Sequence, residues 1–142
     1  MQIHERLLRL NESIQQATDK ANRNLDQIQL VAISKTNPAD AVNEAFNAGQ
    51  IIFGENRVQE AIEKMGELQN LTQLEWHLVG HLQKNKARFC PGRFQWIHSL
   101  ESLELAKRLE KACLEQKQNI NVLIQVNLSG EDSKSGLEKW DQ

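Results

Sequence analysis

Short apolar segments alternate with amphipathic segments along most of this 142-residue chain. The short apolar segments predict strands. The amphipathic segments predict helices, because their apolar side chains recur at helical spacing. Strands and helices that alternate at intervals of roughly 20 to 25 residues predict βαβ units and a parallel sheet. The predicted strands are 30–34, 51–53, 76–79, 94–97 and 120–128, the last being the longest, and the predicted helices are 38–48, 55–68, a short basic one from about Lys84, and 103–113.

Three of the helices carry a clear apolar stripe. In the helix at 38–48, Asn37 fits the N-cap, Pro38 fits the first turn, and Gly49 closes the helix. A further helix precedes the first strand, and we expect its stripe to pack against a globular core rather than to form a coiled coil. The stripe of this N-terminal helix is Ile3, Leu7, Leu10, Ile14, Ala17 and Ala21. The other three stripes, in chain order, are Val42, Ala45 and Phe46; Val58, Ala61, Ile62 and Met65; and Leu103, Ala106, Leu109 and Cys113.

Polar side chains follow every predicted strand, and this feature separates two candidate architectures. In an open doubly wound sheet the functional residues lie at one switch point. This chain has no glycine-rich loop after its first strand, which argues against the dinucleotide-binding version of that fold. In a TIM-type barrel the functional residues lie at the carboxyl ends of the strands all around the barrel. A complete barrel of this type takes about 250 residues. We therefore expect an α/β fold, an incomplete TIM-type barrel of about five strands within a single domain, with an N-terminal helix at 1–25 and βα units at 28–142.

Composition limits the setting in which the chain works. Charged residues are 25% of the chain and the net charge is -2, so no basic field favours nucleic acid. No apolar run is long enough to cross a bilayer, and the first residues do not form a secretory signal. Cys90 and Cys113 indicate reduced thiols, with Cys113 as a small core residue. We expect a cytoplasmic protein with no membrane or nucleic-acid partner.

Lys35 ends the first apolar run and is the strongest candidate for chemistry. An amine at the end of a buried strand is poorly solvated as a cation, which lowers its pKa and frees it to form a Schiff base. A lysine that merely marks the solvent end of the strand is the alternative, and this segment alone favours it. A hydrolytic pair of Ser34 and Lys35 is disfavoured, because neighbouring side chains on a strand point to opposite faces.

Other polar residues allow more than one interpretation. His77 and His81 have the spacing of zinc ligands on a helix, but the pattern is that of a strand and no third ligand has convincing spacing, so we expect no metal site. His81 then fits a pocket wall or a loop histidine. Lys134, in the polar loop 129–136, is either a surface lysine or a second amine near a pocket mouth.

Six segments in fixed order resemble the pyridoxal-phosphate homeostasis protein family. These proteins are single-domain barrels similar to the N-terminal domain of alanine racemase, the fold-type III arrangement. The resemblance covers nearly the whole chain from about residue 28 onward, and the order of the segments makes it specific. The segments are 30–36, 53–60, 76–86, 97–100, 125–127 and 133–136.

The resemblance implies that Lys35 holds pyridoxal 5′-phosphate as a Schiff base. Asn56 matches an asparagine that lines the cofactor pocket, and His81 and Lys134 match positions near its mouth. Position 37 is Asn where many relatives carry a second lysine. In the family, the groups that hold the phosphate, and an arginine facing the ring nitrogen, come from strands beyond residue 142.

The function implied by this resemblance is binding and intracellular homeostasis of pyridoxal phosphate, without catalysis. The expected partners are the cofactor and amino acids, and the full-length form is expected to be a monomer. A fold-type III racemase or decarboxylase is one alternative, which needs a second domain and a catalytic group on the opposite face of the cofactor. A truncated remnant with weak cofactor binding is the other, whose open sheet edges would pair with a complementary C-terminal piece or with a second copy.

Overall fold

The computed structural model describes residues 2–137. Five strands alternate with helices in this part of the chain, as the sequence predicts. Two further helices are short 3₁₀ turns, η1 and η2. The elements in chain order are α1 (Ile3–Lys20), η1 (Leu25–Gln27), β1 (Ala32–Ile33), α2 (Ala39–Asn47), β2 (Ile52–Glu55), α3 (Val58–Glu67), β3 (Glu75–Leu78), η2 (Lys84–Phe89), β4 (Trp96–Leu100), α4 (Leu103–Gln116) and β5 (Asn121–Ile124).

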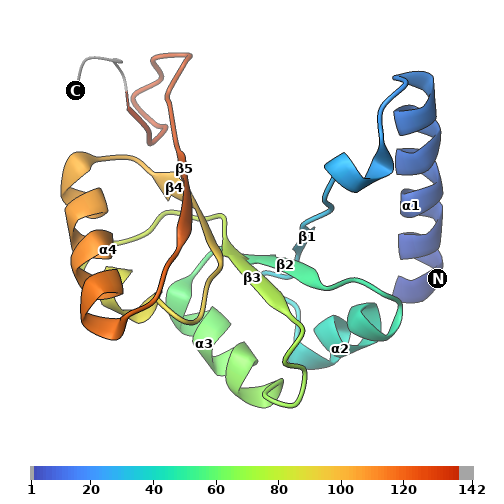
Figure 1. Cartoon of the computed structure of the whole chain (residues 1–142), viewed down its shortest axis with the longest axis horizontal. Helices are drawn as coiled ribbons and strands as arrows, with labels where there is room; N and C mark the ends of the chain where they lie inside the picture. The colour runs from blue at the N-terminus through green and yellow to red at the C-terminus, as the bar shows by residue number, and fades with distance from the viewer. Residues whose placement is uncertain (1, 138–142) are drawn as a thin grey trace.

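The strands form one parallel sheet in the order β1-β2-β3-β4-β5. Each strand therefore lies beside the next one in the chain, with a helical connection between them. Helices α2, α3 and α4 follow the outer side of the curved sheet, and α1 stands at its β1 end (Figure 1). Because all strands run the same way, their carboxyl ends and the loops that follow lie along one edge.

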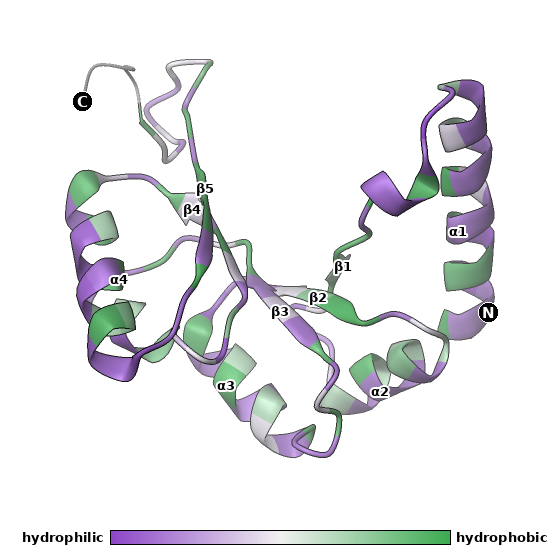
Figure 2. Cartoon of the chain, viewed as in Figure 1, coloured by the Kyte–Doolittle hydropathy of each residue, from purple (hydrophilic) through white to green (hydrophobic). Residues whose placement is uncertain are grey.

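The hydrophobic core lies between the sheet and these helices. Phe53, Leu78 and Ile97 point from the sheet into this core and are almost completely buried. Trp76 packs against Phe53 with ring centroids 5.8 Å apart. Apolar residues on α2, α3 and α4 face these side chains, while most of the helices' outer residues are hydrophilic (Figure 2). This layer holds the strands in the register that places the polar strand ends together.

The opposite face of the sheet is much more open. One residue from each strand forms a row across it through the paired positions of the sheet. Within this row Ile33 is 48% exposed, and all four residues of β5 are exposed. The exposure is uneven, because Gly54 and His77 in the middle of the row are buried while the strands at the two ends of the sheet are exposed. The row consists of Ile33, Gly54, His77, Trp96 and Asn121.

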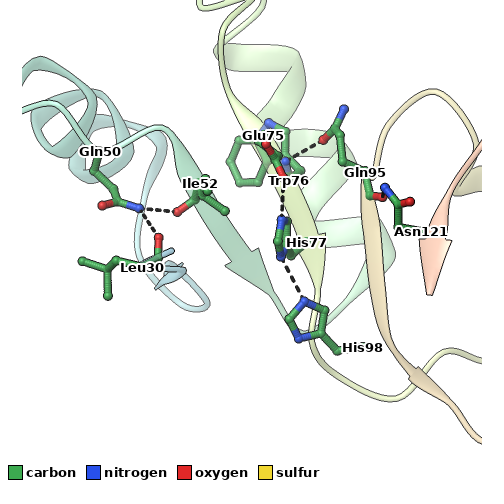
Figure 3. A network of polar contacts seen from close by, with 9 residues as sticks. All are labelled: Leu30, Gln50, Ile52, Glu75, Trp76, His77, Gln95, His98 and Asn121. Atoms are coloured by element: carbon green, nitrogen blue, oxygen red, sulfur yellow. Dashed lines mark hydrogen bonds and ion pairs between the residues drawn. The ribbon is translucent and has the colours of Figure 1, made fainter. Parts of the chain in front are cut away.

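Side-chain hydrogen bonds join the first elements to the sheet. The amide nitrogen of Gln50 donates to the carbonyl oxygens of Leu30 and Ile52, at 2.8 and 2.6 Å (Figure 3). The backbone N–H of Ile3 donates to a carboxylate oxygen of Glu44 on α2, at 2.9 Å. The N-terminal helix thus packs on the globular part, as expected.

Several element boundaries differ from the prediction. Glu55 was expected to start a helix but ends β2, because its backbone pairs with Leu78 of β3. The fifth strand ends at Ile124 and has four residues, whereas β4 has five. The pairing of β4 with β5 shifts register between Ile97 and Leu100, which interrupts the regular ladder.

The expected N-cap and parts of two apolar stripes are also wrong. Pro38 occupies the N-cap position of α2, and the Asn37 amide donates to the carbonyl of Lys35 instead, at 3.1 Å. Leu10 and Leu103 are exposed at 43% and 66%, because each helix turns a neighbouring row of residues toward the core. Cys113 is only half-buried, while Cys90 is fully buried.

None of the helices in residues 2–137 combines the length and apolar character needed to cross a membrane.

Candidate functional site

Lys35 lies immediately after β1, in the turn that connects the strand to α2. Its side chain is exposed, so the burial expected from the sequence is not observed. The physical reason is that β1 ends at Ile33 on the outermost strand of the sheet, and Lys35 is already in the loop. Ser34, by contrast, is buried, which agrees with the argument against a Ser-Lys pair.

Asn56 occupies the matching position just after the neighbouring strand, β2. Ile33 of β1 pairs with Gly54 of β2, and Lys35 and Asn56 each lie two residues beyond that pair. The half-buried Asn56 lines a groove of about 420 Å³ together with residues of the loop after β3. This first groove is lined by Asn56, Arg57, Val58, Gln59, Gly80, His81, Gln83 and Lys86.

His81 lies between the first groove and a second one. The second groove, of about 520 Å³, contains Lys134 and the segment that follows β5. The imidazole of His81 is more than half exposed, and its Nδ1 lies 3.0 Å from a carboxylate oxygen of Glu101. Lys134 is exposed and pairs with Glu131 at 3.0 Å. The structure therefore joins His81 to Asn56 on one side and to Lys134 on the other, while Lys35 lines neither groove.

A glycine allows the loops after β2 and β3 to approach each other closely. A Cβ atom on Gly80 would lie 2.3 Å from the backbone oxygen of Asn56 and 2.7 Å from its Cα. Real Cβ atoms do not approach backbone so closely, so any other residue at position 80 would push Asn56 away. Gly80 therefore helps to define where the Asn56 amide lies.

A chain of polar side chains crosses the open face of the sheet (Figure 3). His77 Nε2 lies 2.9 Å from a carboxylate oxygen of Glu75, and His77 Nδ1 lies 2.9 Å from Nε2 of His98. Burial, together with the neighbouring His77, lowers the pKa of His98 below its ordinary value. If His77 donates to Glu75, its Nδ1 accepts from His98, which leaves Nδ1 of His98 as an acceptor.

The loop that carries Lys134 is organised by Asn127, which is buried. The Asn127 amide nitrogen donates to the carbonyls of Glu131 and Lys134, at 3.0 and 3.3 Å. Its oxygen accepts from the backbone N–H of Gly130 at 3.2 Å. Asn127 belongs to the segment 125–127 that carries the family resemblance, but no role was predicted for it.

Sequence reasoning missed a buried cluster directly behind Lys35. It consists of Ser34, Glu55 and Lys64, and we call it the Ser34–Glu55–Lys64 cluster. Lys64 was overlooked because it is charged, although its spacing from Ala61 and Leu68 places it on the buried stripe of α3. That spacing was the available signal.

The residues present are chemically suited to the cofactor expected from the resemblance. A primary amine forms a Schiff base with an aldehyde, and the exposed amine of Lys35 is open to a ligand from solvent. The Asn56 amide, at the equivalent place just after β2, offers both a donor and an acceptor to a polar ring. Lys35 and Asn56 would therefore hold the cofactor, with His81 and Lys134 farther along the same edge.

The sequence profile described as "Alanine racemase, N-terminal domain" matches residues 7–142. The chain belongs to this family. This assignment agrees with the parallel α/β sheet and with the barrel-type arrangement that the polar strand ends predicted.

The chain is also similar to individual members of the family. It is 43% identical over 138 residues to the pyridoxal phosphate homeostasis protein of Escherichia coli K12, covering 96% of this chain and 59% of that protein. It is 44% identical over 139 residues to the protein of the same name in Pseudomonas aeruginosa, covering 98% and 60%. The chain thus spans about three fifths of the length of these relatives.

Solved structures show the same fold. PipY of Synechococcus elongatus without pyridoxal phosphate superposes with a TM-score of 0.84 at 44% identity, over 96% of this chain and 59% of that one. The same protein with pyridoxal phosphate bound gives 0.76 at 42% identity, over 88% and 57%. Alanine racemase of Enterococcus faecalis, with a TM-score of 0.55 at 16% identity over 87% of this chain and 33% of that one, shows likeness of fold alone.

Proposed function

We propose that this chain binds pyridoxal 5′-phosphate through Lys35 as a Schiff base and serves its homeostasis in the cytoplasm as a carrier, not as an enzyme. The observation that carries this proposal is that Lys35 is exposed and lies beside Asn56 in the sheet register, since each is two residues beyond the paired residues Ile33 and Gly54. Support comes from similarity to proteins named for pyridoxal phosphate homeostasis and to one solved with the cofactor bound.

The exposure of Lys35 suits exchange with free cofactor. The neutral amine adds to the aldehyde carbon, and one water leaves as the C=N bond forms, with no oxidant or reductant required. The bound cofactor supplies the aldehyde and a conjugated ring. Because Lys35 is open to solvent, water or another amine, such as that of an amino acid, can reverse the bond. A racemase or decarboxylase instead benefits from a site that excludes water.

The other three site residues are proposed to act without forming the covalent bond. Asn56 would donate or accept hydrogen bonds at the ring, since its amide lines the first groove. His81 would form the wall shared by both grooves. Lys134 would supply a second amine beyond His81, on a loop that Asn127 holds. We also propose that residues 1–142 form part of a single barrel domain.

The test is to add pyridoxal phosphate to the purified chain and record the visible absorbance of a lysine Schiff base. Borohydride reduction, intact mass and peptide mapping then locate the adduct. We expect one adduct on Lys35 and none at that position in Lys35→Ala, while Lys111→Ala, an exposed lysine on α4, should behave as the wild type. An equal yield on Lys35→Ala would refute the assignment of Lys35.

A second measurement separates the carrier from an enzyme. Amino-acid racemisation and decarboxylation are followed with cofactor in excess. We expect no turnover above that of free cofactor. Turnover that Lys35→Ala abolishes would favour the enzyme instead.

A further inference from the structure

The turn that carries Lys35 has a strained backbone. The backbone N–H of Asn37 donates to the carbonyl of Ser34 at 3.1 Å, which closes a turn with Lys35 and Thr36 at its centre. Thr36 has a φ of +62°, a left-handed conformation that is rare for a β-branched residue. Such strained residues persist where the surrounding structure over-determines them, and they cluster at functional sites.

The Ser34–Glu55–Lys64 cluster holds the start of this turn. The ammonium group of Lys64 donates to the same Ser34 carbonyl at 2.8 Å. It also donates to Oε1 of Glu55, and the Ser34 hydroxyl donates to that oxygen at 2.6 Å. The carbonyl and the side chain of Ser34 are therefore both anchored, one residue before Lys35.

All three members of the cluster are buried. Glu55 is 0% exposed, Ser34 6% and Lys64 8%. Among the described residues, Oε2 of Glu55 has no hydrogen-bond partner, so the carboxylate is not fully satisfied. Removing two charges from water is costly, and well-packed apolar residues often stabilise a fold as well as a buried ion pair or better. Stability alone therefore gives a poor reason for a charged pair at this place.

We propose that Lys64 and Glu55 are positioning residues for Lys35. They fix the Ser34 carbonyl, and through it the strained turn, so that the Lys35 amine is held ready to add to an aldehyde. This role rests on the proposed function of Lys35. Without the cluster the turn relaxes, Lys35 samples more directions, and the addition that forms the C=N bond and releases water becomes slower.

The experiment uses the double variant Lys64→Met/Glu55→Gln, which removes both charges at once and so leaves no lone buried ion. Lys111→Met/Glu115→Gln makes the same changes in a solvent-exposed ion pair on α4, with side chains 79% and 63% exposed. The rate of Schiff-base formation is measured against pyridoxal phosphate concentration. Reduction and peptide mapping confirm that the adduct is on Lys35, and urea unfolding measures stability.

We expect roughly tenfold slower adduct formation on Lys35 in the cluster variant, because small misplacements of a reacting group have large effects on rate. The half-saturating cofactor concentration and the urea midpoint should stay close to those of the wild type. The exposed control should match the wild type in every measurement.

A wild-type rate in the cluster variant would overturn the positioning role. So would a slower rate that is accompanied by an equal loss in the exposed control, or by a lower urea midpoint, since both indicate a general effect. The proposed function fails separately: in that case the wild-type chain itself forms no adduct on Lys35.

Discussion

Ser34 and Lys35 are neighbours in the chain but lie in opposite surroundings. Ser34 is 6% exposed and bonds to Glu55, whereas Lys35 is exposed in the turn. Alternation along a strand predicted that the two side chains diverge. They do, but Lys35 lies in the turn after β1 and not on the strand itself. The expected desolvation of Lys35 was wrong, because the sequence does not show that β1 ends at Ile33. The reactivity that we propose for Lys35 would therefore depend on accessibility and position rather than on burial.

The shifted pKa of His98 predicts how the stability of the fold depends on pH. Burial and His77 lower its pKa in the folded chain below the ordinary value of 6.5. As the pH falls below about 6.5, the unfolded chain binds a proton that the folded chain does not, so stability decreases until the folded pKa is passed. The pH dependence of the urea midpoint between pH 7.5 and 5.5 should therefore be weaker in His98→Gln than in the wild type.

The control for this prediction is His4→Gln, at an exposed position on α1. It should keep the pH dependence of the wild type. His77 and Glu75, the titratable groups in line with His98, are unchanged in both variants. An identical pH dependence in His98→Gln and the wild type would contradict the prediction.

At the scale of elements, the alternation of strands and helices was predictable, but several ends were not. Glu55 has a side chain suited to a helix start, and only its pairing with Leu78 places it in β2. Lys64 lies on the buried stripe of α3, where its charge is offset by Glu55 on the adjoining strand. Propensity describes one segment at a time, whereas these two assignments depend on contacts between segments.

The close approach of the β2 and β3 loops leads to a prediction for Gly80. In Gly80→Ala the new Cβ would overlap the backbone of Asn56. We expect a loss of about 1–3 kcal/mol in the free energy of unfolding, since overpacking costs about that amount. Pyridoxal phosphate should also bind more weakly, because Asn56 moves. Urea unfolding and a cofactor titration measure the two effects.

Gly66→Ala is the matched control on α3. A Cβ there meets nothing within 4 Å. Alanine is favoured over glycine inside a helix by roughly 0.5–1 kcal/mol, so this variant should be slightly more stable. Equal stability of Gly80→Ala and the wild type would show that the loops can separate without cost.

At the scale of the whole molecule, the sheet is covered by helices on one face and is much more open on the other (Figure 1). The exposed apolar residues include Ile33 at 48% and Ile124 at 61%. Strands at the end of a sheet present unpaired backbone groups that can pair with another chain. The 142-residue polypeptide by itself therefore has the features of a chain that associates.

We expect this 142-residue polypeptide to sediment as species heavier than its 16.3 kDa monomer. Ile124→Lys, on β5, should shift the distribution toward monomer, because a charge at a strand edge opposes pairing. Leu114→Lys, at a position that is 74% exposed on α4, should not. Adding a separate C-terminal piece of a relative's barrel should also reduce self-association. A monodisperse wild-type monomer would contradict the prediction.

The sequence was enough to predict the alternation of elements, the parallel sheet, and the places of Lys35, Asn56, His81 and Lys134 after the first, second, third and fifth strands. These features follow from local periodicity and from the direction of parallel strands. The tertiary structure alone decided that Lys35 is exposed, that Asn56 and Lys134 line different grooves, and that Lys64 reaches behind Lys35. These depend on strand ends and on contacts between residues far apart in the chain, since Lys64 and Ser34 are 30 positions apart.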